Sequence, residues 1–184
     1  MPLTIETPRL LLRQWKDSDV DPWAEMNADP RVMEFFPWTF DRARSEETAA
    51  RMRRELERDG FGFYVVELKH NGQFAGIIGI DEIPYDVPFT PAREVGWRLA
   101  YDTWGHGYAT EGAKAALAMA FDRLGWEEVV AVTALVNKRS ERVMQRLGMV
   151  RDPSADFDHP RVPEGHALRP HMLYRIRRDQ VPKD

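Results

Sequence analysis

Cysteine is absent from this 184-residue chain. Without a thiol the protein can form no disulfide, no thiolate metal site and no cysteine nucleophile, so those classes of chemistry are excluded. Long apolar runs are also missing, and the first residues lack the basic start and apolar core of a secretion signal. We therefore expect a cytoplasmic protein without a membrane partner.

The chain also lacks an excess of positive charge. The chain has 26 lysines and arginines against 30 aspartates and glutamates, which gives a formal net charge of −4. This balance offers no electrostatic basis for general nucleic-acid binding, and the aromatic residues cluster with prolines rather than with basic residues. We therefore expect no nucleic-acid partner.

Hydrophobic residues make up 43% of the sequence and charged residues 30%, as in ordinary globular proteins. The length predicts one domain over residues 1–184, with a core at about 7–177. Apolar and β-branched runs predict strands at 7–13, 61–68, 74–80, 93–100, 127–136, 150–157 and 172–176. Helical spacing predicts helices after residue 17 and at 44–59, 110–124 and 138–147.

The predicted strand at 93–100 alternates between two faces. Glu94, Gly96 and Arg98 lie on one face, and the apolar residues between them lie on the other. A glycine inside a strand predicts either a bulge or a close approach of another backbone. The strand, helix, strand order that follows predicts a right-handed parallel crossover.

The run from Trp104 to Glu111 places two glycines between that strand and the next predicted helix. Small residues let the backbone approach a ligand closely, and the free N–H groups of a helix N-terminus favour an anion such as a phosphate. The run matches neither a P-loop nor a full dinucleotide-binding pattern. Taken alone, it could equally be a tight strand-to-helix connection.

The flanking sequence carries a resemblance. Trp104-Gly105-His106-Gly107-Tyr108-Ala109-Thr110-Glu111, then Asn137-Lys138-Arg139-Ser140 and the run from Arg142 to Met149, resemble the GNAT acetyltransferase superfamily. More narrowly they resemble its RimJ/RimL-type branch, in which Trp104 replaces the glutamine or arginine that usually opens the pyrophosphate loop. The resemblance extends from Thr7 to Arg177 and implies an α/β fold: a mostly antiparallel seven-stranded mixed sheet, splayed between strands 4 and 5, with about four flanking helices.

The resemblance also implies a function, namely acetyl transfer from acetyl-CoA to a primary amine by direct attack in a ternary complex. It implies that Ser140 protonates the leaving sulfur and that Asn137 orients pantetheine or the acceptor. A general base could be Glu94, or Asp156 or Asp158 near the sixth strand, or water alone. The implied cofactor-binding residues are Trp97, Arg98 and Leu99 through their backbone, Trp104, Gly105, His106, Gly107, Tyr108, Ala109, Thr110, Asn137 and, at the 3′-phosphate, Arg142.

Several alternatives stay open at this point. Asn137 and Ser140 could be a turn and a cap residue, and the aromatic loop at 35–40 could be a self-buried loop as well as a wall of the acceptor groove. The acceptor could be a protein N-terminal α-amine or a small-molecule amine, and the protein a monomer or a homodimer. A non-catalytic acyl-CoA-binding regulatory module is the alternative function. The irregular spacing of His159, His166 and His171 favours structural histidines over a metal site, so we expect no metal.

Overall fold

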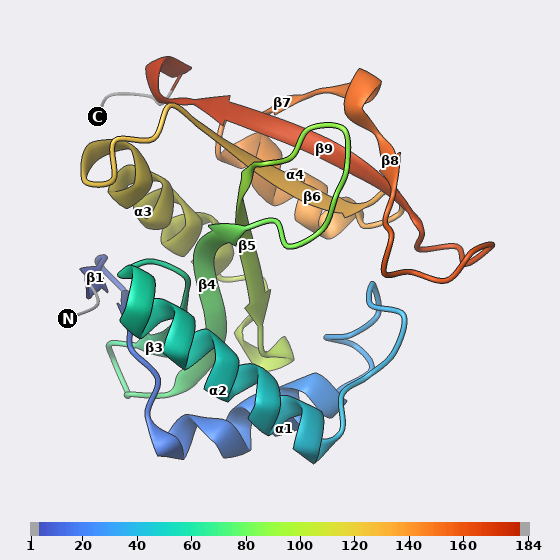
Figure 1. The fold of residues 1–184 in the computed structure, drawn as a ribbon. Coiled ribbons are helices and arrows are strands. Elements are labelled where there is room, and N and C mark those ends of the chain that lie inside the picture. Colours follow the sequence, from blue (N-terminus) through green and yellow to red (C-terminus); the bar gives the residue numbers. More distant parts are fainter. Residues whose placement is uncertain (1–3, 181–184) are drawn as a thin grey trace.

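One mixed sheet forms the centre of the computed structural model, which describes residues 4–180 (Figure 1). Within that range its strands follow the order β1-β2-β3-β4-β5-β6-β9-β7, and β8 pairs with β9. The strands are β1 (Ile5–Glu6), β2 (Leu10–Arg13), β3 (Phe63–Leu68), β4 (Phe74–Glu82), β5 (Arg93–Leu99), β6 (Glu128–Ala134), β7 (Val150–Arg151), β8 (Phe157–Asp158) and β9 (Pro170–Arg177). The helices are α1 (Val20–Ala28), α2 (Arg42–Asp59), α3 (Tyr108–Asp122) and α4 (Lys138–Arg146).

The sheet is antiparallel except between β5 and β6. Those two strands run parallel and are joined at a single residue pair, Glu94 with Val130. Beyond that pair they diverge, and β6 and β9 cross at a large angle to β4 and β5 (Figure 1). The predicted splay between the fourth and fifth long strands is therefore confirmed.

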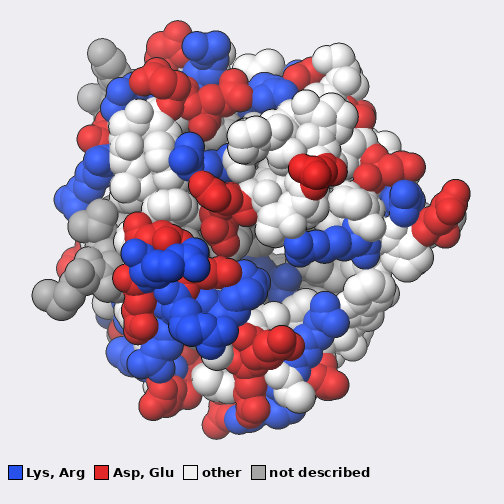
Figure 2. Space-filling view, in the orientation of Figure 1, with Lys and Arg blue, Asp and Glu red and all other residues white. Residues whose placement is uncertain are grey.

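Helices cover both faces of the β2–β5 half. The α3 stripe of Ala113, Ala116 and Ala120 is fully buried, because small side chains allow the helix to approach the sheet closely. On the opposite face, α1 and α2 pack over Val65 and Ile77. The outer surface of α2 carries intermixed acidic and basic residues, as expected for a solvated face (Figure 2).

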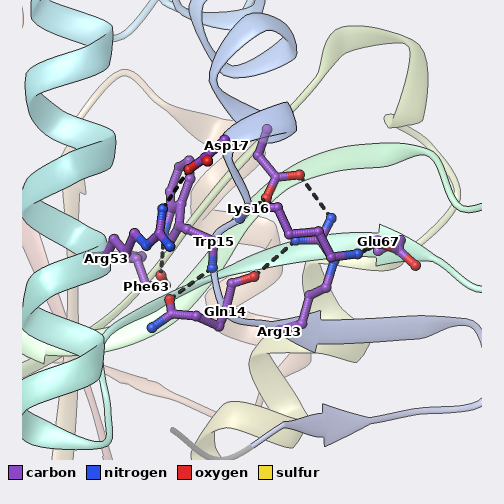
Figure 3. Close-up of polar contacts among 9 residues, drawn as sticks. Arg13, Gln14, Trp15, Lys16, Asp17, Arg53, Phe63 and Glu67 are labelled. Carbon is purple, nitrogen blue, oxygen red and sulfur yellow. Dashed lines mark hydrogen bonds and ion pairs between the residues drawn. The ribbon is translucent and has the colours of Figure 1, made fainter.

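A buried ion-pair network anchors the connection from β2 to α1 (Figure 3). Both terminal nitrogens of Arg13 bond the carboxylate of Asp19 at 2.8 Å, and its Nε donates to Glu67 at 2.6 Å. The Trp15 indole N–H donates to the carbonyl of Phe63 at 3.1 Å. Arg13 and Asp19 are only 9% and 3% exposed, so their paired charges fix where α1 starts relative to the sheet.

Two expectations about strands are corrected. The strand predicted at 150–157 is interrupted by a short 3₁₀ turn at Pro153–Ala155, because proline has no N–H for a continuous ladder. No bulge occurs at Gly96, since β5 pairs with β4 in unbroken register, and the irregularity lies in β3 between Val66 and Glu67. A side chain at Gly96 would instead stand 3.1 Å from the Phe63 ring, so the glycine makes room for that ring.

Candidate active site

A cavity of about 730 Å³ opens between the diverging strands β5 and β6 and the N-termini of α3 and α4. Most of the residues predicted from the sequence line it: Glu94, Trp97, Arg98, Leu99, Trp104, Gly105, Gly107, Tyr108, Ala109, Thr110, Asn137, Ser140 and Arg142. Three predicted residues do not. The exposed His106 is outside its lining, and so is Asp158, which is exposed on β8 and pairs with Arg169. Asp156 is likewise outside it and pairs with Arg151.

The turn before α3 has the geometry of an anion cradle. Gly105 and Gly107 adopt φ values of 81° and 79°, in the left-handed region that residues with a side chain rarely occupy. Gly107 is the N-cap of α3, and no side chain caps this helix start. The first N–H groups of the helix and its dipole are therefore available to a negatively charged group.

Two side chains brace the cradle: Arg9, which directly precedes β2, and Trp104 of the turn itself. The Arg9 Nη1 donates to the carbonyl of His106 at 2.9 Å, its Nε bonds Glu111 at 2.6 Å, and its guanidinium lies 4.8 Å from the centre of the Tyr108 ring. Behind the turn, the Trp104 indole N–H donates to the carbonyl of Leu99 at 2.9 Å. His106 therefore serves through its backbone carbonyl, on the outer side of the turn.

Backbone amides of β5 face the cavity. Ala100 N–H donates to Ala75 on the β4 side, and antiparallel strands alternate the direction of their polar groups from residue to residue. The N–H and C=O groups of Trp97 and Leu99 therefore point toward β6. Between these strands, sheet pairing among the described residues is confined to Glu94 and Val130, so the opening leaves room for an extended ligand.

Glu94 occupies the vertex of this opening. Burial raises the pKa of its carboxyl to about 8; the opposing Asp81 adds to the rise, and a hydrogen bond from the backbone of Val132 works against it. Burial also raises the pKa of Asp81, which lies directly across from it on β4. Two adjacent carboxyls in a desolvated site resist ionisation together, so Glu94 is poised to exchange a proton near neutral pH.

Asn137 has a structural task as well as a place in the cavity. Its Oδ1 accepts from the Ser140 N–H at 3.1 Å, which caps α4, and its Nδ2 donates to Thr133 at 3.0 Å. The predicted cap is therefore present. The Ser140 hydroxyl makes no hydrogen bond to the described protein, and this residue lines the cavity at the start of α4. Its hydroxyl is thus available to a ligand.

The far wall of the cavity contains residues that the sequence did not single out for this site. His159 and His171 lie 4.7 Å apart between ring centres, and Tyr85 lies 4.6 Å from His159. Burial lowers the pKa of His159 to about 4 and also lowers that of His171, so both rings are neutral at pH 7. The irregular spacing of these histidines in the sequence did not indicate that their rings lie close together. Within residues 4–180 there is no cluster of three metal-ligating side chains.

Comparisons with known proteins match this geometry. A family model described as "Acetyltransferase (GNAT) domain" matches residues 9–150. The chain belongs to the GNAT acetyltransferase family. The predicted resemblance is confirmed, and the protein is an acetyl-CoA-dependent N-acetyltransferase.

Relatives of this acetyltransferase include the Bacillus subtilis protein YkkB, 30% identical over 78% of this chain and 83% of that protein. The FsC-acetyl coenzyme A-N(2)-transacetylase of Aspergillus fumigatus is 30% identical over 79% of this chain and 64% of that protein. An acetyltransferase structure from Agrobacterium tumefaciens aligns with a TM-score of 0.77 at 26% identity, covering 96% of this chain and 95% of that one. RimL in complex with coenzyme A aligns at 0.76 over 95% of this chain and 98% of its own, and at 15% identity this likeness shows the fold. Among the described residues of the acetyltransferase, no helix could cross a membrane.

Proposed function

We propose that this acetyltransferase acetylates a primary amine by direct attack on acetyl-CoA bound in the β5–β6 opening. The acceptor is a small-molecule amine or a protein N-terminal α-amine, as in the RimL-type structures that share its fold. One observation carries the proposal: four features lie in the same cavity. They are the anion cradle, the β5 amides that face the cavity, the Glu94 carboxyl with its raised pKa, and the free hydroxyl of Ser140.

Binding of the donor follows from the cradle and the strand. The pyrophosphate would lie on the amides after Gly107, and the pantetheine arm would pair with the amides of Leu99 and Trp97. Arg142, exposed on α4 at the cavity rim, would meet the 3′-phosphate. The acyl group would then reach the vertex, near Glu94.

The chemistry requires three things: removal of a proton from the amine, stabilisation of the oxyanion and protonation of the leaving thiolate. An ammonium is not a nucleophile, so Glu94 in its ionised form would remove one proton from the amine, directly or through water. The amine nitrogen then bonds the thioester carbon, and the Trp97 N–H would stabilise the oxyanion. As the C–S bond breaks, the Ser140 hydroxyl would give its proton to the departing thiolate and recover one, through solvent, from the protonated nitrogen of the newly formed amide.

The proposal is tested by two measurements on the full chain. Calorimetric titration with acetyl-CoA should show binding, and a free-thiol assay should show CoA release with small amines or N-terminal peptides as acceptors. Binding without thiol release from any acceptor would favour the regulatory acyl-CoA-binding module. No binding would overturn the cradle assignment itself.

A further inference from the structure

The strongest unexplained feature of the cavity is the side chain of Arg98. It lies on the same face of β5 as Glu94, turned toward α1 and the loop at 29–41. Its terminal Nη1 donates to Asn27 Oδ1 at 2.7 Å, and its buried Nε has no hydrogen-bond partner. Among the described residues no carboxylate pairs with it.

Three aromatic rings hold the guanidinium in place. Its carbon lies 4.1 Å from the ring centre of Phe36, 5.3 Å from Trp23 and 5.4 Å from Phe40. Asn27 is fully buried, and its own Nδ2 is bound to Ser45, so the amide oxygen that orients Arg98 is itself fixed. A planar cation that is clamped between rings and bonded at one edge has its remaining donors preorganised.

Burial without an acidic partner is costly for a cation. It lowers the pKa of Arg98 to about 10, which still leaves the group charged at neutral pH. Two other arginines of the cavity wall are neutralised within the protein, since Arg51 pairs with Glu55 and Arg139 pairs with Glu34, and the three remaining arginines of the lining are exposed. Arg98 is the partly buried cation of this wall that has no carboxylate partner among the described residues.

We propose that Arg98 binds a carboxylate of the acceptor, so that the substrates of this enzyme are primary amines bearing a carboxylate several bonds from the amine. This inference rests on the acetyl transfer proposed above. Arg98 and Glu94 are four positions apart on one strand face, so their backbones lie about 13 Å apart. The two ends of an ω-amino acid can reach both groups, whereas the amine and carboxylate of an α-amino acid share one carbon and cannot.

The test uses the free-thiol assay with a series of acceptors: glycine, β-alanine, γ-aminobutyrate and ε-aminocaproate, each beside its neutral primary amide. With wild-type protein, kcat/KM should favour a longer-chain carboxylate over its amide by about ten- to a hundredfold, mostly through KM, as expected for a charge-assisted bidentate contact. Arg98→Gln should raise KM for the carboxylate toward that of the amide, so that the ratio of the two kcat/KM values falls to about one. Arg51→Gln, a cavity arginine already paired, is the matched control and should keep the preference.

Each outcome decides the question. Equal rates with carboxylates and amides in wild type, an intact preference in Arg98→Gln, or a preference for N-terminal peptides without a nearby carboxylate would overturn the inference while leaving acetyl transfer established. No thiol release with any acceptor, despite acetyl-CoA binding, would overturn the proposed transfer and this inference with it. If Arg98→Gln fails to fold by circular dichroism, the wild-type comparison of carboxylate with amide still decides.

Discussion

Replacement of Glu94 by glutamine gives the sharpest test of the proposed base. The carboxyl has a pKa of about 8, so about one molecule in ten carries the ionised base at pH 7. Below pH 8, the contribution of Glu94 to kcat/KM of the wild type should rise about tenfold per pH unit because the ionised fraction does so, and it should level off above that. Glu94→Gln should lower kcat/KM by about 10²–10⁴-fold at pH 8.5.

An α-amine acceptor also loses its proton near pH 8, so the informative quantity is the ratio of wild-type to variant kcat/KM at each pH. The acceptor's titration cancels in that ratio, and what remains is the titration of Glu94. A ratio that stays constant from pH 6 to 9 would refute the assignment of Glu94 as the base.

The same substitution makes an independent prediction for stability. The pKa of Glu94 is about 8 in the folded protein and near 4.5 in the unfolded chain. Between these two pH values the unfolded chain ionises and the folded protein does not, so the free energy of unfolding falls as the pH rises through this window. The loss is at most about 1.4 kcal/mol per pH unit in that window. Urea unfolding at pH 6 and pH 9 should show this loss in wild type and a smaller one in Glu94→Gln. Equal losses in both proteins would mean that a group other than Glu94 causes the pH dependence of stability.

The other predictions concern the serine, the cradle, the cap and the buried ion pair. Ser140→Ala should lower kcat by about tenfold or more while calorimetry finds the same acetyl-CoA affinity, because the cap on α4 uses only the backbone N–H of Ser140; unchanged kcat would remove the hydroxyl from the mechanism. Gly107→Val should abolish acetyl-CoA binding, since a β-branched residue at φ 79° is strained by roughly 1–2 kcal/mol and disfavours the backbone conformation of the turn; wild-type affinity would contradict the cradle. Asn137→Ala should cost about 1 kcal/mol in urea unfolding through the lost cap, whereas Asn137→Asp should keep the cap, and equal losses would contradict that role. Asp19→Ala should cost roughly 1–3 kcal/mol because it removes the carboxylate from the two terminal nitrogens of the buried Arg13 and leaves Glu67 as its remaining acidic partner, and no measurable loss would contradict the network.

Local patterns predicted much of the fold. The apolar runs predicted as strands at 61–68 and 74–80 form β3 and β4, and the helical spacing predicted at 110–124 forms α3. These predictions succeed because strand and helix formation there depends on residues that are close together in the sequence. The strand expected at 150–157 failed because apolar content alone did not reveal that Pro153 would interrupt the pairing with β9.

The positions of Glu94 and Arg98 on the sheet followed from the sequence, but their charge states did not. Glu94 and Arg98 could be placed on one strand face by alternation, yet the pKa of each depends on what surrounds it in space. Asp81 faces Glu94 from the neighbouring strand, and Asn27 meets Arg98 from a helix seventy-one positions earlier in the chain. Sequence periodicity carries no information about such contacts, whereas burial and partner identity decide the charge state.

The brace that Arg9 builds against the carbonyl of His106 and the carboxylate of Glu111 has a consequence for how this enzyme can vary. A side chain nearly a hundred positions before the turn holds the shape that the donor's phosphates would meet, without lining the cavity itself. Donor affinity is therefore open to adjustment from the edge of the sheet, by changes that leave the acceptor groove and its charges intact. Selection can in this way tune how strongly the enzyme is saturated with its donor separately from which amine it accepts.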